Sequence, residues 1–223
     1  MAVGYSLSYK GWIVTSPDGV TWTQRDSGSA DLRGIAWGGG RFVAVGWYET
    51  ILTSPDGVIW TACVSGISGY VRAITWGGGQ FVAVGDGGMI LTSPDGMTWT
   101  RRESETTADL PTITWGGGQF VAVGYWYGSG SDRGTILTSP DGVTWTAEYT
   151  GTSKQLQGVA SNGRQFVAVG EIILLSSSQG SAVGVFRDGD WFLDANGNGQ
   201  WDGCSQDGGQ DACLFNSFSQ VGD

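Results

Sequence analysis

The chain of 223 residues contains no histidine, few prolines, three cysteines and only two lysines, Lys10 and Lys154. Because histidine is absent, Ser-His-Asp triads, Cys-His dyads and histidine-ligated zinc or iron are excluded. A net charge of −10, from 21 acidic and 11 basic residues, does not fit a nucleic-acid-binding surface. No apolar run reaches the roughly 18 residues of a membrane span. We also expect no signal peptide, because the N-terminus lacks a basic segment followed by a long apolar stretch.

Glycine, with 40 copies, and tryptophan, with 12, are instead abundant, and they occur in two alternating motifs. The first motif is Ser-Pro-Asp-Gly with a tryptophan shortly after it, and its copies begin at residues 16, 54, 93 and 139. The second resembles ITWGGGQFVAVG, and its copies end at Gly46, Gly85, Gly124 and, in a weaker form, Gly170. A period of about 40 residues made only of β-type segments is typical of the blades of a β-propeller.

Each repeat predicts four short antiparallel strands, which we name A to D. In one copy these are residues 74–76, 81–84, 90–92 and 97–100. Strand B is almost wholly apolar, as expected for a strand buried on both faces. Between strands C and D, Pro94-Asp95-Gly96 predicts a tight hairpin, because proline presets φ, aspartate binds local amides and glycine tolerates positive φ.

Counting these segments predicts the architecture of the whole chain. The repeats supply 18 strands, counting a truncated strand B at residues 1–4, whereas five blades of four strands require 20. The β-rich segments 182–187 and 191–194 can supply the two missing strands. We therefore predict an all-β, five-bladed β-propeller of four-stranded antiparallel blades, with the ring closed by C-terminal strands. The predicted division is residues 1–180 for the blades and 181–223 for an acidic C-terminal segment.

The hairpin motif SPDGxTW resembles the Asp-box of sialidase-type and related bacterial propellers, S-x-D-x-G-x-T-W, although here glycine follows aspartate directly. The resemblance covers about residues 1–176 and implies a structural role: the aspartate ties its hairpin together, and the tryptophan packs between blades. A ring of these carboxylates around a ligand is the weaker alternative. The arginine triad of sialidases has no counterpart, so the resemblance does not define an activity. The residues concerned are Asp18, Asp56, Asp95 and Asp141, and Trp22, Trp60, Trp99 and Trp145.

The C-terminal segment differs in composition, with seven aspartates against one arginine between residues 184 and 223. Its oxygen-bearing side chains have the spacing of an EF-hand-type calcium loop with glycine at the sixth position, although the twelfth is serine rather than glutamate. The segment also resembles an integrin-type FG-GAP repeat, in which such loops bind calcium. An Asn-Gly-rich hairpin turn is the alternative. The predicted calcium ligands are Asp194, Asn196, Asn198, Gln200, Asp202 and Asp207.

The cysteines flank this loop or lie apart from it. Cys204 and Cys213 are nine residues apart, and in an oxidising compartment they would form a disulfide. Cys63 ends a predicted strand D and is expected to be a small buried residue rather than a nucleophile. The resemblances, the calcium loop and the disulfide together predict an extracellular or cell-surface origin.

The propeller resemblance implies that ligands meet the face with the B–C and D–A connections, which is where the copies differ. The residues following the strand-B glycine are expected to form a ring on that face, joined by two arginines at equivalent positions before the inner strand. The ring residues are Tyr5, Trp47, Asp86, Tyr125 and Glu171, and the arginines are Arg33 and Arg72.

Three functions fit such a face. The favoured one is a module that binds carbohydrate or protein, because exposed aromatic residues stack on sugars and anchor protein loops. These aromatic residues are Trp47, Tyr48, Tyr125, Trp126 and Tyr127. The second is a calcium-dependent hydrolase of phosphotriesters, lactones or glycosides, with Asp86 and Glu171 as catalytic carboxylates. In the third, the loops only complete the packing or support assembly. The oligomeric state is left open.

Overall fold

The computed structural model describes residues 1–5, 11–28, 31–48, 50–63, 66, 68–126, 133–148 and 154–170, and the strands at 173–176, 183–187, 190–193 and 212–214. In these parts the chain is all-β, with a single 3₁₀ turn, η1 (Asp86–Gly88). No helix within the described ranges is long and apolar enough to cross a membrane.

Five antiparallel sheets are built from strands that are consecutive in the chain. The first contains β1 (Ala2–Tyr5), β2 (Gly11–Thr15) and β3 (Thr23–Arg25). The second contains β4 (Leu32–Gly38), β5 (Arg41–Gly46), β6 (Ile51–Ser54) and β7 (Thr61–Cys63). The third contains β8 (Val71–Gly77), β9 (Gln80–Gly85), β10 (Ile90–Ser93) and β11 (Thr100–Arg102).

The fourth sheet contains β12 (Asp109–Gly116), β13 (Gln119–Trp126), β14 (Arg133–Ser139) and β15 (Thr146–Glu148). The fifth contains β16 (Leu156–Ser161), β17 (Phe166–Gly170), β18 (Ile173–Ser176), β19 (Val183–Arg187), β20 (Asp190–Leu193) and β21 (Ala212–Leu214). The predicted four-stranded antiparallel repeat is thus confirmed in the second, third and fourth sheets.

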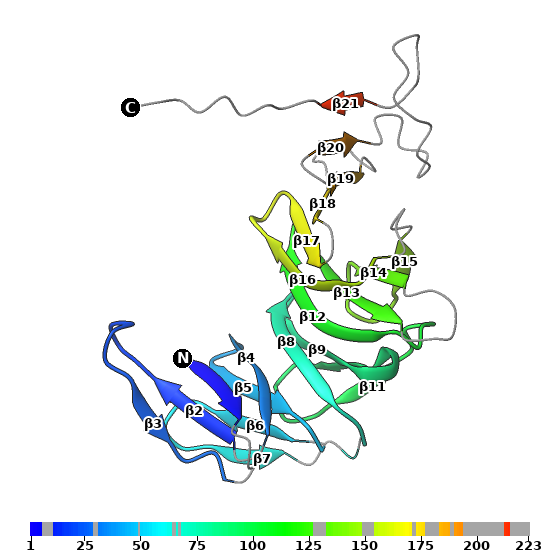
Figure 1. Ribbon diagram of the computed structural model, residues 1–223. Coiled ribbons are helices and arrows are strands. Elements are labelled where there is room, and N and C mark those ends of the chain that lie inside the picture. Colours follow the sequence, from blue (N-terminus) through cyan, green and yellow to red (C-terminus); the bar gives the residue numbers. More distant parts are fainter. Residues whose placement is uncertain are drawn as a thin grey trace, which may run out of the picture.

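The sheets follow one another in chain order along an arc (Figure 1). The inner strands β4, β8, β12 and β16 lie next to one another, and β1 lies beside β4. We call each sheet a blade. The described strands do not form a closed ring, and the predicted number of five blades stays a prediction.

The C-terminal strands differ from the predicted arrangement. Strand β19 pairs with β18 and so completes the fifth blade, but β20 pairs with β19 and adds a further strand to the same sheet. In the described residues β1 pairs with β2 alone. The reason lies in the connection of β19 to β20, because Asp188-Gly189 is a two-residue sequence that favours an antiparallel hairpin between its neighbours.

The hydrophobic core lies between successive blades, and each interface joins two different faces. The two valines of strand B in the earlier blade make one face, which we call the valine face. Opposite it, an alanine of strand B, a leucine of strand C and the hairpin tryptophan of the later blade make the tryptophan face. In the second interface Val43 and Val45 meet Ala83, Leu91 and Trp99, and in the third Val82 and Val84 meet Ala122, Leu137 and Trp145. Strand B is apolar throughout because both of its faces are buried.

The Ser-Pro-Asp-Gly hairpins are held by their own side chains. In the third blade, Asp95 Oδ1 accepts hydrogen bonds of 2.8 Å from the amides of both Met97 and Thr98. Ser93 Oγ donates to the same carboxylate and accepts from the amide of Gly96. The other three copies have the same bonds from the amides to the aspartate and the serine, which confirms the structural role predicted for the aspartates.

Two consequences follow from these hydrogen bonds. The backbone amides that bind the four aspartates lower the pKa of each, and they bring that of Asp18 to about 2.

The prediction of strand D was three residues too early, because the structure begins β11 at Thr100 rather than at Met97. The amides of Met97 and Thr98 bind Asp95, so they are not available to a sheet ladder.

Candidate functional site

A β-bulge positions the two arginines of the candidate site. Leu32 lies opposite Gly46 and Gly34 opposite Val45, so Arg33 is the extra residue of β4. The register of β8 shifts in the same way around Arg72. A bulge interrupts the ladder and redirects the side chain of the extra residue. The equivalence of Arg33 and Arg72, predicted from the repeat, is therefore confirmed in the structure.

The glycine that ends each strand B permits a close approach between neighbouring strands. A Cβ atom on Gly46 would overlap the carbonyl oxygen of Asp31. With glycine there, the amide of Trp47 donates to that oxygen over 2.9 Å, and in the next blade the amide of Asp86 donates to the Tyr70 carbonyl over 3.1 Å. The residue after strand B and the residue before strand A are thereby held side by side.

An aromatic cluster, which we define as Arg33, Trp47, Tyr48 and Tyr70, lies where the second and third blades meet. The guanidinium carbon of Arg33 lies 4.1 Å from the centre of the Trp47 ring, and both guanidinium contacts to the Asp31 carboxylate are within 3.3 Å. Tyr70 lies 5.0 Å from Trp47 and 5.4 Å from Tyr48, measured between ring centres. The stacked arginine and the aromatic rings thus form one surface contributed by two blades.

Tyr48 is the most accessible member of this cluster. Its side chain is 70% exposed, and its backbone has a φ of +53°, a region that disfavours bulky residues. A hydrogen bond to Tyr70 raises the pKa of Tyr48 above its ordinary value. Beneath it, the indole N–H of Trp47 is buried and donates to no acceptor in the described structure. An exposed aromatic side chain at positive φ makes Tyr48 a candidate for the functional site.

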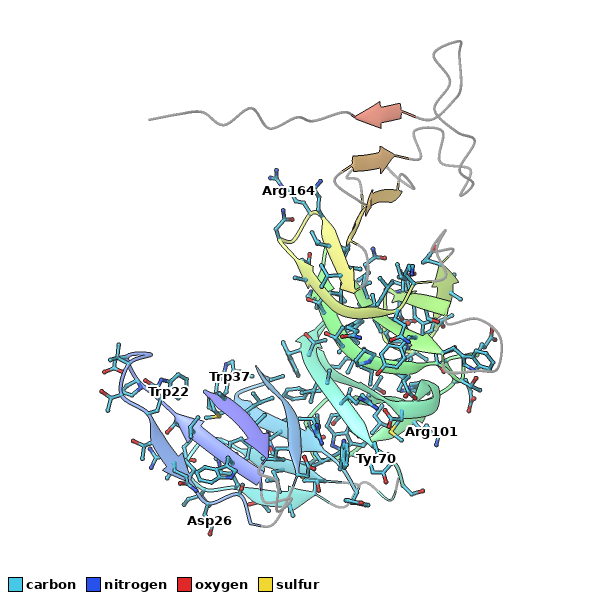
Figure 2. All side chains as sticks on the ribbon, viewed as in Figure 1. Trp22, Asp26, Trp37, Tyr70, Arg101 and Arg164 are labelled. Carbon is cyan, nitrogen blue, oxygen red and sulfur yellow. The ribbon has the colours of Figure 1, made fainter. Side chains whose placement is uncertain are left out.

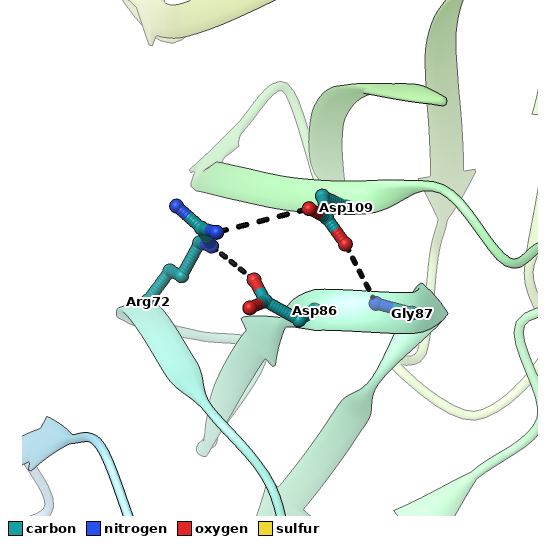
Figure 3. A network of polar contacts seen from close by, with 4 residues as sticks. All are labelled: Arg72, Asp86, Gly87 and Asp109. Carbon is teal, nitrogen blue, oxygen red and sulfur yellow. Dashed lines mark hydrogen bonds and ion pairs between the residues drawn. The ribbon is translucent and has the colours of Figure 1, made fainter. Parts of the chain in front are cut away.

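A second group of side chains joins the third and fourth blades (Figure 3). Arg72 Nε donates to Asp86 Oδ1, and Arg72 Nη2 lies 3.7 Å from Asp109 Oδ2. The other oxygen of Asp109 accepts from the amide of Gly87 over 2.9 Å. The hydrogen bond to Asp86 is the main reason that the pKa of Arg72 is raised. We call Arg72, Asp86 and Asp109 the ionic cluster.

This geometry suits positioning better than acid–base chemistry. Arg72 donates to one oxygen of Asp86 and so holds this carboxylate in place where the third and fourth blades meet. Glu171, its predicted catalytic partner, lies outside the described residues. Across the described part of the chain, no three acidic or cysteine side chains gather into a possible metal site.

The other predicted site residues are distributed as follows. Tyr125 is buried on β13 opposite Asp109, and Trp126, the last residue of β13, is 39% exposed. Tyr5 ends β1, and Tyr127 lies outside the described residues. The predicted calcium ligands Asp194 to Asp207 and Cys204 also lie outside them, and Cys213 is part of β21. Calcium binding and the disulfide stay predictions.

Cys63 is a free thiol at the end of β7. It is half-buried and packs against the core between the second and third blades. Burial raises the pKa of the Cys63 thiol, which disfavours the reactive thiolate.

Sequence reasoning missed Tyr70 and Asp109, which contribute the third-blade ring to the aromatic cluster and the second carboxylate to the ionic cluster. A signal for them exists, because both occupy the repeat position of Asp31, immediately before the first apolar residue of strand A. This position varies between copies, as does the residue after strand B that it contacts.

No protein-family model and no curated protein matches this sequence. Solved structures do match: YCF48 bound to D1 peptide, at 18% identity and a TM-score of 0.54, covers 89% of this chain and 78% of its own. The WD40 propeller domain of Doa1 matches at 10% identity and a TM-score of 0.56, covering 88% and 75%. A nidogen/laminin complex matches at 14% identity and a TM-score of 0.56, covering 78% and 74%. With the repeated antiparallel blades, these similarities show that the fold is a β-propeller.

Proposed function

We propose that this chain is a β-propeller module that binds a protein partner, and that the aromatic cluster is its contact surface. The observation that carries the proposal is the exposed Tyr48 ring, held at positive φ against Tyr70 and Trp47. Tryptophan, tyrosine and arginine are the residues that most often contribute the binding energy of protein interfaces. All members of the cluster are of these three types.

The chemistry of the cluster suits a peptide segment with an apolar side chain. The rings provide an apolar surface, and the partly exposed carboxylates of Asp86 and Asp109 in the ionic cluster are hydrogen-bond acceptors. A peptide can place a side chain on Tyr48 and Tyr70 and direct its backbone amides to these carboxylates. One structural neighbour, YCF48, was solved with a bound peptide, which supports this type of ligand.

Carbohydrate stacking on the same rings is the main alternative ligand, and a glycan array distinguishes it from peptide binding. An extracellular origin and a structural calcium ion in the C-terminal segment still rest on the sequence pattern. The hydrolase alternative gains no support from Asp86, because Arg72 engages its carboxylate.

Selection from a displayed random-peptide library on the immobilised chain, in parallel with a glycan array, tests the proposal. Tyr48→Ala is expected to weaken the binding of the selected peptides at least tenfold, because an interface loses one of its anchor residues. Ile59→Ala is the matched control, because Ile59 is also 70% exposed but lies in the hairpin at the far end of its blade. Equal binding by wild type and Tyr48→Ala, or enrichment of glycans alone, would contradict a peptide site here.

A further inference from the structure

In the part of the chain that the structure describes, the first and fifth blades each expose one half of a blade interface, at the two ends of the row. The second and third interfaces each pair the valine face of one blade with the tryptophan face of the next. In the first interface Met1 and Val3 replace the two valines, and in the fourth the valines pack on Ala168 without a tryptophan. Among the described residues, no strand packs on the tryptophan face of the first blade or on the valine face of the fifth.

The uncovered tryptophan face is made by Ala2, Val14 and Trp22. Trp22 is 46% exposed, whereas the equivalent Trp99 and Trp145 are only 8% and 7% exposed. The hairpin glycine gives the same result: a Cβ on Gly19 would meet no atom within 4 Å, whereas at the other hairpins it would meet the preceding blade. The residues of this face correspond to those of the internal faces, with Val14 in place of leucine, and no described residue covers Trp22 as the internal tryptophans are covered.

The uncovered valine face is made by Val167 and Val169 on β17. Val169 is 41% exposed, although the valines at the same repeat position in the three preceding blades are fully buried. Phe166 and Ala168 on the same strand pack towards the fourth blade, so the alternating valines point away from it. This surface has the residues that receive a tryptophan face elsewhere in the molecule.

Polar groups at the two ends complement each other in the same way. At an internal interface, Gln80 of the earlier blade donates through Nε2 to the carbonyl of Asp141 in the later hairpin. The residue equivalent to Gln80 in the fifth blade is Gln165, which is exposed beside Arg164. The hairpin at the other end exposes Asp18, so a cation and an amide donor are available for an acidic hairpin.

Figure 2 shows Trp22 and Arg164 at opposite ends of the row of blades. We propose that the valine face of the fifth blade binds the tryptophan face of the first blade in a second copy of this chain. The occupant is a second copy because its free end has the residues that complete the internal interfaces, and because the two faces of one chain are apart and exposed. The contact joins two different surfaces, so copies associate head to tail.

Variants that each block one face test this head-to-tail contact in the full chain. Wild type is expected to show a mass that rises with concentration above the 23.4 kDa monomer in analytical ultracentrifugation. Trp22→Arg and Val169→Arg should each remain monomeric. An equimolar mixture of the two variants should form a species of twice the monomer mass, because each supplies the face that the other lacks.

Val58→Arg is the matched control, because Val58 is 47% exposed but belongs to the second blade and to neither end face. It should associate as wild type does, and melting curves of all three variants should show a folded protein. A monomeric wild type at every concentration would overturn the proposal. So would a mixture that forms no heterodimer. Destabilisation of monomers by both end variants would instead indicate that the two faces meet within one chain.

Discussion

Arg72 on β8 and Asp109 on β12 form an ion pair that joins the third blade to the fourth at the edge of the aromatic cluster. Both side chains are about a quarter to a third exposed, so water weakens the pair without removing it. The same arginine holds Asp86, which places two carboxylates, one from each blade, around one guanidinium. This arrangement fixes the relative position of the two blades next to the proposed contact surface.

A double-mutant cycle with Arg72→Met and Asp109→Asn measures that link. We expect a coupling of about 0.5–1 kcal/mol in the free energy of unfolding, in the range for partly exposed pairs. Raising the salt concentration should reduce it. Urea unfolding of the four proteins gives the value, and strictly additive effects would show that the pair contributes nothing.

Tyr48→Gly is expected to separate stability from binding. Glycine relieves the positive φ at this position, so the melting temperature should rise by about 2 °C, while peptide binding is lost. Ile59→Gly serves as control, because Ile59 has no positive φ and glycine there should lower the melting temperature. A lower melting temperature for Tyr48→Gly would mean that the ring is needed for packing.

Acid should unfold the chain through its hairpin aspartates. Their folded pKa values are lowered, so their contribution is present above the ordinary value of 3.8 and is lost as the pH falls towards about 2, as for Asp18. Unfolding curves measured across this range should show the loss. Asp95→Asn should flatten the pH dependence, because asparagine keeps the acceptor oxygen but does not titrate. If Asp95→Asn leaves the acid transition unchanged, other carboxyl groups cause the unfolding.

The hairpin tryptophans should differ greatly in their contribution to stability. Trp99→Ala removes a buried ring between two blades and is expected to lower the free energy of unfolding by about 3–5 kcal/mol. Trp22→Ala, measured on dilute protein, should lower it by less than about 1 kcal/mol, because the ring is half exposed. Similar losses for both would indicate that Trp22 is covered within the monomer.

Calcium should stabilise the chain through its C-terminal loop. Melting curves with calcium are expected to lie above those with a chelator, and Asp194→Ala should remove the difference. Asn162→Ala, in a turn of the fifth blade, serves as a control that keeps the calcium response. Identical curves with calcium and with chelator would show that the calcium prediction is wrong.

The repeated blade was predictable from sequence because its signals are local and occur several times. The strands predicted at residues 74–76, 81–84 and 90–92 all lie within the observed strands β8, β9 and β10. The position of β20 was not predictable by counting strands, because a two-residue turn decided its pairing. Tyr70 and Asp109 were missed for a different reason. Their partners lie across a blade boundary or across a bulge, and spacing within one repeat does not reveal such contacts.

Each blade packs against its neighbours in the chain, so its stability depends on the interfaces with those neighbours. The third blade has packed neighbours on both sides, whereas the first has one. Local opening should therefore start at the ends of the row and move inwards. Amide protons of β9 should therefore exchange with solvent last, and those of β2 among the first. The free energy of local opening is then highest at the centre of the row.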